Sequence, residues 1–89
     1  MTHPFTKIYS FNSTQEVATC LVPEDAVLFE NLFVCFNGGT VTEEYPGSTW
    51  HTLSIQNISV SNNILTIDTY YPCNKAATVS WSADVYYAN

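Results

Sequence analysis

The segment Ala77–Tyr87, Ala-Thr-Val-Ser-Trp-Ser-Ala-Asp-Val-Tyr-Tyr, decides the fold class. Apolar and polar residues alternate along it with a period of two, which is the pattern of a β-strand with one buried face. The intervening positions carry mostly hydroxyl groups, which suit a pleated sheet better than a helix. We therefore expect one long strand here, with Trp81 in the core and Tyr86 on the opposite, polar face.

A β-hairpin is expected upstream of this strand. Residues 49–60 and 64–71 are rich in β-forming residues and flank Asn62-Asn63. Asparagine tolerates the positive φ angles that a tight hairpin turn requires. A two-residue turn at these asparagines places four aliphatic side chains on one face. They form the pairs Val60 with Leu65 and Ile58 with Ile67. Turn chemistry and hydrophobic register therefore predict the same pairing.

The apolar phase of the first hairpin strand shifts farther from the turn. Leu53 and Ile55 fall on the face opposite to Ile58. A β-bulge near Gln56-Asn57, or a strand that changes sheet there, would explain the shift. The two explanations remain open at this point.

The N-terminal part of the chain contains two shorter strand candidates. Residues 5–11 alternate, with Phe5, Lys7, Tyr9 and Phe11 on one face. Residues 17–22 form a short β-branched run that ends at Pro23, which cannot donate to a β-ladder. Residues 12–14, Asn-Ser-Thr, are expected to be the turn between these strands.

Residues 27–36 are the ambiguous segment. The preceding Pro23-Glu24-Asp25 resembles a helix start, but the run is dense in Val, Phe and Leu, and Asn37-Gly38-Gly39 follows it as a turn signature. We favour a strand. A further turn is expected at residues 45–48, Tyr-Pro-Gly-Ser. About six or seven strands then predict a single all-β domain over residues 1–89, built as a small antiparallel β-sandwich or barrel.

The chain contains no arginine and only two lysines, Lys7 and Lys75, against eight acids, so its formal net charge is −6. Arginine binds phosphate and carboxylate through a bidentate fork. Binding to nucleic acid requires neutralisation of phosphates, and binding to an anionic membrane surface also requires basic residues. Ser, Thr, Asn and Gln supply 29 of the 89 residues. We therefore expect an uncharged polar surface, with no nucleic-acid partner and no membrane partner.

The N-terminus and the cysteines indicate the compartment. The first seven residues lack the basic start and long apolar stretch of a signal peptide, and no segment approaches the roughly 18 apolar residues that span a bilayer. We expect a soluble protein made in the cytoplasm.

Cys20, Cys35 and Cys73 are an odd number at wide spacings. We interpret them as buried, reduced thiols; one disulfide plus a free thiol, or a metal or catalytic role, are the alternatives.

The sequence carries no motif of an enzyme or a metal site. His3 and His51 are far apart, whereas a zinc site needs several ligands at short spacings. No G-x-S-x-G, phosphate-binding loop or dinucleotide fingerprint is present. Glu43 and Glu44 are adjacent, so in a strand they point to opposite faces and cannot pair as catalytic carboxylates. We expect no catalytic residue, no metal and no cofactor.

The aromatic residues are the strongest candidates for binding. Trp50 follows an expected turn with His51 beside it, Tyr70 lies opposite the aliphatic face of the hairpin, and Tyr86 lies on the polar face of the last strand. Exposed Tyr and Trp on such a face could stack on sugar rings or anchor a protein interface. The alternative is that a second sheet covers them. These four are the candidate binding residues.

Three functions fit this surface. The favoured one is a non-enzymatic structural or assembly domain that contacts a protein partner or copies of itself, as in a virion surface, decoration or minor capsid component. A carbohydrate-binding module with exposed Trp and Tyr is the second. A small acidic phage-type inhibitor of a host protein is the third. The acids are scattered along the chain, which argues against a DNA mimic.

Overall fold

The computed structural model describes the backbone of residues 4–43, 50–70 and 77–89, and the side chains of residues 4–41, 53–70 and 78–89. These residues form seven β-strands. They are β1 (Thr6–Ser13), β2 (Val17–Leu21), β3 (Leu32–Glu43), β4 (Trp50–Thr52), β5 (Ser54–Ser61), β6 (Ile64–Tyr70) and β7 (Ala77–Tyr87). The prediction of an all-β fold is confirmed, and Ala77–Tyr87 is one continuous strand.

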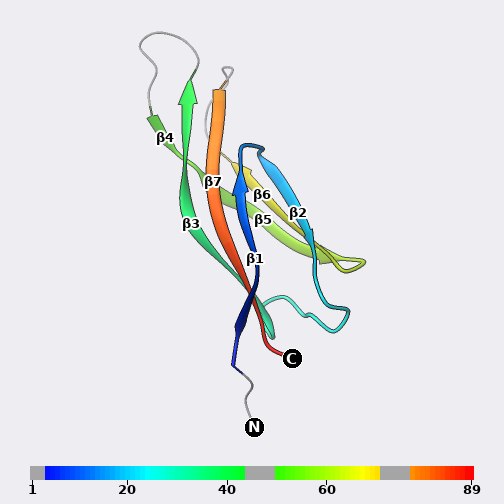
Figure 1. The fold of residues 1–89 in the computed structure, drawn as a ribbon. Coiled ribbons are helices and arrows are strands. Elements are labelled where there is room, and N and C mark those ends of the chain that lie inside the picture. Colours follow the sequence, from blue (N-terminus) through cyan, green and yellow to red (C-terminus); the bar gives the residue numbers. More distant parts are fainter. Residues whose placement is uncertain (1–3, 44–49, 71–76) are drawn as a thin grey trace.

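The strands make two antiparallel sheets, packed face to face as a small sandwich (Figure 1). One sheet has four strands in the order β1-β7-β3-β4, and the other has three in the order β2-β6-β5. The three-stranded sheet lies at an angle across the four-stranded one (Figure 1). Of the two architectures expected from the sequence, the chain adopts the sandwich.

The core lies between β7 and β6, the central strands of their sheets. Val79, Trp81, Ala83 and Val85 are buried on one face of β7, as the alternation predicted. Leu65 and Ile67 are fully buried on β6. Trp81 is only 3% exposed, and its indole N–H donates to the backbone oxygen of Gln15 at 2.7 Å. The one polar group of this core side chain therefore has a partner, as a buried indole requires.

The hairpin of β5 and β6 has the predicted register. Val60 pairs with Leu65 and Ile58 with Ile67, and the turn residues Asn62 and Asn63 have φ angles of 51° and 64°. Two consecutive positive φ angles are the signature of a type I′ turn, whose twist matches that of the strands.

Both explanations for the phase shift in β5 apply. The register shifts between Ile55 and Asn57, which places a bulge at Gln56 and turns Ile55 back toward the core. The chain also changes sheet between β4 and β5, at Leu53, which is buried. The bulge and the change of sheet therefore occur three residues apart.

Asn37-Gly38-Gly39 is not a turn, contrary to the sequence-based expectation. It lies inside β3, where the register against β7 shifts between Phe36, opposite Ala83, and Gly38, opposite Ser82. Gly38 has a φ of 107°. The segment is therefore a β-bulge, which uses the same positive φ as a turn without reversing the chain.

The other boundaries also differ from the expectation. β3 begins at Leu32, so residues 23–31 are a loop and only the second part of the 27–36 segment is strand. Asn12 and Ser13 belong to β1, and residues 14–16 make the β1–β2 turn. The expected turn at 45–48 lies outside the described residues.

Two further expectations concern side-chain faces. A register shift between Lys7 and Tyr9 breaks the alternation in β1, so Lys7 does not share the core face with Phe11. Cys20 and Cys35 are both free, but only Cys20 is buried, and burial raises the pKa of its thiol. Cys35 is exposed because β3 presents it on the face away from the other sheet. Cys73 lies outside the described residues.

Candidate functional site

The four candidate binding residues do not form one site. The backbone places Trp50 and His51 in β4, opposite Thr42 and Val41 of β3; their side chains lie outside the described residues. Tyr70 is the last residue of β6 and is 52% exposed. It pairs with Ser54, which lies two residues after the end of β4. Tyr86 lies on β7, in the other part of the four-stranded sheet.

Tyr86 belongs to the outer face of the four-stranded sheet, because it alternates with the buried Val85. It stands opposite Lys7 of β1 on one side and Phe33 of β3 on the other. The expectation that Tyr86 leaves the core face is thus supported by the register, and the register adds an aromatic neighbour that the sequence analysis did not identify.

Three exposed phenylalanines lie together, and one of them, Phe33, stands opposite Tyr86. Phe5, Phe29 and Phe33 are 47%, 62% and 39% exposed. The Phe5 and Phe33 rings meet edge to face at a centroid distance of 5.2 Å, and the Phe29 and Phe33 centroids are 6.2 Å apart. Phe5, Phe29, Phe33 and Tyr86 are called the aromatic patch below. Aromatic side chains of this kind dominate the energetics of protein interfaces.

The patch is assembled from segments far apart in the sequence. Phe5 precedes β1, Phe33 is the second residue of β3, Tyr86 is near the end of β7, and Phe29 is in the loop of residues 23–31. These segments come together at the end of the molecule that carries the C-terminus (Figure 1). Sequence reasoning missed the patch because nothing along the chain indicates that Tyr86 pairs with Phe33 or that Phe5 contacts it.

Several hydrogen bonds brace the loop that carries Phe29. Asn31 accepts from the Val27 amide at its side-chain oxygen, at 2.6 Å, and donates from its side-chain nitrogen to the Asp25 backbone oxygen at 3.1 Å. The Tyr87 hydroxyl donates to the Asp25 carboxylate at 2.5 Å. This bond to the carboxylate raises the pKa of Tyr87, because it favours the protonated phenol.

Phe29 itself has a φ of 68°, in the left-handed region. This conformation costs a residue with a Cβ roughly 1–2 kcal/mol. It allows the chain to pass around the edge of β3: Leu28 packs against the core, while Phe29 contacts Phe33 on the outer face. The Phe29 amide donates to the Leu32 backbone oxygen at 2.8 Å, which fixes this geometry. A backbone that glycine would adopt more easily is thus occupied by an exposed phenylalanine.

A polar network lies next to the patch on the same face. Asp84 accepts hydrogen bonds from the Ser10 hydroxyl at 2.8 Å and from the Asn37 amide at 3.1 Å, and Lys7 is 3.8 Å away. Chiefly the Ser10 and then the Asn37 hydrogen bond lower the pKa of Asp84. Asn37 is the bulged residue of β3, and bulges commonly re-aim a side chain in this way.

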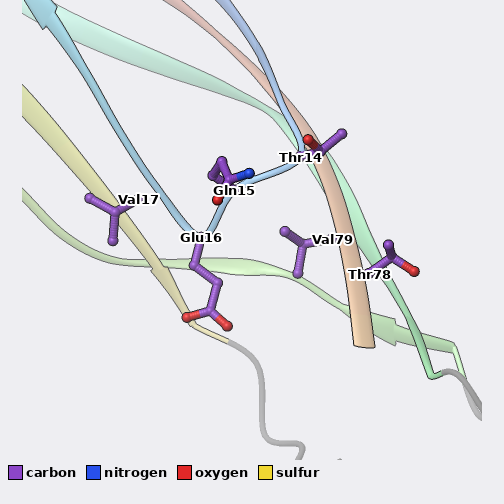
Figure 2. Close-up of a pocket in the computed structure, with 6 residues that line it drawn as sticks. All are labelled: Thr14, Gln15, Glu16, Val17, Thr78 and Val79. Atoms are coloured by element: carbon purple, nitrogen blue, oxygen red, sulfur yellow. The ribbon is translucent and has the colours of Figure 1, made fainter. Parts of the chain in front are cut away.

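An open pocket of about 440 Å³ lies at the β1–β2 turn (Figure 2). The described residues of its lining come from that turn and from the start of β7, and among them Glu16 carries the one carboxylate. The Glu16 backbone oxygen accepts from both the amide and the hydroxyl of Thr69, which ties the turn to the core. Among the described lining residues, one carboxylate and two threonine hydroxyls without a second acid or base do not make a catalytic arrangement.

Comparisons with known proteins found no match: no family model, no curated protein and no solved structure matches the chain. Within the described residues, no group of three or more His, Cys, Asp or Glu side chains could hold a metal ion. The same part of the chain has no helix long and apolar enough to cross a membrane.

Proposed function

We propose that this chain is a non-enzymatic assembly protein that acts through protein–protein contacts, with copies associating edge to edge through β5. The observation that carries the proposal is the composition of this edge strand. β5, Ser-Ile-Gln-Asn-Ile-Ser-Val-Ser, has eight residues without a charge or a proline. No described strand pairs with its outer side. Such an edge presents unpaired backbone groups that can accept another strand.

The other sheet edges carry features that discourage pairing. β1 has Lys7 and a register shift directly after it. β2 has five residues and is followed by Pro23, and β4 has three residues. Charged residues, irregularities, prolines and short strands are the usual ways in which proteins protect sheet edges. The irregularity of β5 lies near its start, at Gln56, so residues 57–61 remain a regular, neutral edge.

The surface chemistry supports the same proposal. Short hydroxyl and amide side chains allow two copies to approach closely without desolvating charges. An antiparallel pairing of β5 with itself would create a two-fold symmetric contact, the commonest symmetry of homo-oligomers. A virion surface, decoration or minor capsid component is the setting in which we place this chemistry, since such parts assemble from many copies of small domains.

The test is the mass of the protein in solution, measured by size-exclusion chromatography with light scattering. We expect the wild-type chain to exceed its monomer mass of 10.0 kDa, and to associate more strongly at higher salt because salt screens the repulsion of its −6 charge. Ser59→Lys places a charge on β5 and should give a monomer. Ser80→Lys adds the same charge on the central strand β7 and should leave the mass unchanged. A wild-type chain that is monomeric at every concentration contradicts the proposal.

Glycan binding is the second candidate, and the observation in its favour is the exposure of Tyr70. An exposed ring with Ser54 opposite it offers a stacking surface beside a hydroxyl group. This function predicts hits on a glycan array that disappear in Tyr70→Ala. The absence of any hit for the wild-type chain would remove it.

A further inference from the structure

We propose that the aromatic patch is a docking surface for an arginine-bearing segment of another protein. The patch is separate from the β5 edge: its residues belong to the four-stranded sheet and the loop of residues 23–31, whereas β5 is in the three-stranded sheet. Docking at the aromatic patch is therefore independent of the proposed self-association through β5.

The exposure and the rigidity of the aromatic patch indicate a binding surface. Its phenylalanines remain 39–62% exposed although they contact one another. Phe29 is held in a costly backbone conformation by a loop with its own network of hydrogen bonds. Residues in strained conformations persist where the surroundings over-determine them, and they cluster at sites that hold ligands. A rigid loop presents its aromatic ring without a large entropy cost on binding.

The charge around the patch defines the partner. The loop carries three of the eight acids of the chain, Glu24, Asp25 and Glu30, within seven residues. Asp84 on the sheet face lies 3.8 Å from Lys7, so these two charges offset each other and the three loop acids supply the negative charge. An apolar aromatic surface with an acidic rim complements a group that is both cationic and able to stack. Guanidinium has both properties: it stacks on aromatic faces, it is weakly hydrated, and it binds carboxylates with a planar fork.

A second copy of this chain does not fit the same surface. The chain has no arginine, so it cannot supply a guanidinium group. Two copies placed patch to patch would also bring two acidic rims together, and like charges across an interface are unfavourable. The complementarity therefore favours a different protein, with arginine next to aliphatic or aromatic residues that cover the phenylalanine rings.

The test uses Phe29→Gly, which removes the exposed ring and also relieves the positive φ. We expect this variant to keep its fold, with an unchanged or higher melting temperature, because glycine adopts φ near 68° without strain. A random dodecapeptide library on phage is selected on the wild-type chain and counter-selected on Phe29→Gly. We expect the recovered peptides to be enriched in arginine beside apolar residues.

A recovered peptide is then synthesised and its affinity measured by calorimetry. We expect its Kd to be at least about tenfold weaker for Phe29→Gly and severalfold weaker when its arginines become lysines. Glu30→Gln should weaken the affinity for the peptide to a smaller degree. Tyr70→Ser, a matched change of an exposed aromatic residue on the other sheet, should leave the affinity unchanged. Recovered peptides without arginine enrichment, or no peptide that distinguishes wild type from Phe29→Gly, overturn the inference. Self-association that Phe29→Gly abolishes also overturns it, because a second copy would then be the occupant.

Discussion

Asn62-Asn63 and Asn37-Gly38-Gly39 look alike in the sequence but form different structures. The first is a hairpin turn and the second a β-bulge. Both are short runs of residues that tolerate positive φ, and both use it: φ is 51° and 64° at the two asparagines and 107° at Gly38. At Asn62-Asn63 the chain reverses, and β5 pairs with β6. At Asn37 the chain bulges and continues along β7.

The difference lies in the partner of the flanking segments. On either side of Asn62-Asn63 the aliphatic residues match each other at hairpin spacing, so a reversal buries both sets together. On either side of Asn37 both segments match the same long strand, β7, whose alternation continues for eleven residues. Both sites therefore tolerate positive φ, and the strand available for pairing decides whether the chain forms a turn or a bulge.

The largest effect should come from closing the space at Gly39. A Cβ there would lie 2.6 Å from the Trp81 Cβ and 2.8 Å from the Ser80 backbone oxygen, so neither neighbour is a flexible side-chain end that could move aside. We expect Gly39→Ala to destabilise the protein by about 1–3 kcal/mol, the usual cost of overpacking. Urea denaturation followed by tryptophan fluorescence measures this, since Trp81 reports on the contact. A stability equal to wild type would mean that β3 and β7 are not in this close contact.

A substitution at Gly38 should destabilise the protein for a different reason. A Cβ at Gly38 has nothing within 4 Å, but the φ of 107° is strained for any residue with a side chain. We expect Gly38→Ala to cost about 1–2 kcal/mol from backbone strain alone. Gly38→Asn is the matched variant and should cost less, because asparagine tolerates positive φ better. Equal losses for Ala and Asn in urea denaturation would contradict the assignment to backbone conformation.

The hairpin turn should tolerate a change that keeps its conformation. Asn63→Gly gives Asn-Gly, the preferred pair for a type I′ turn. We expect the free energy of unfolding to change by less than about 1 kcal/mol, because the relief of strain offsets the greater freedom of glycine in the unfolded chain. Cross-strand nuclear Overhauser effects between residues 58 and 67 should persist. Their loss would show that the asparagine side chain, rather than its φ, sets the register.

The smallest effect concerns Asp84, which accepts a hydrogen bond from the bulged residue Asn37. The Ser10 and Asn37 hydrogen bonds lower the pKa of Asp84 in the folded protein from the ordinary value of 3.8. Asp84 therefore contributes stability above pH 3.8, and this contribution is lost as the pH falls from there through the lower folded-state pKa. The stability difference between wild type and Asp84→Asn, measured by urea denaturation across pH, should be largest near neutral pH and shrink in acid. A difference independent of pH would show that the Asp84 charge is not what these bonds stabilise.

Much of the fold was accessible from local patterns, and little of the candidate site was. The period of two in residues 77–87 gave the strand and its buried Trp81, and the aliphatic pairs around Asn62-Asn63 gave the hairpin register. Tyr86 was placed correctly on the outer face by the same alternation. Phe5, Phe29 and Phe33 were missed, because their proximity depends on two strands pairing with β7 and on a loop that passes around β3. A signal existed at Phe33, which alternates with Leu32 in the predicted strand, but its aromatic neighbours become known only from the pairing of β1, β7 and β3.

Properties that depend on neighbours along the chain follow from the amino-acid sequence alone. These are the alternation that makes strands, the positions that permit positive φ, and a composition without arginine, which gives mostly uncharged polar side chains and a net charge of −6. Strand pairing in three dimensions sets the rest: which site that tolerates positive φ becomes a turn and which a bulge, which sheet edges stay unpaired, and which aromatic rings meet. The physical reason is that backbone preferences act over a few residues, whereas strand pairing is a choice among distant partners, made by the burial that each pairing achieves.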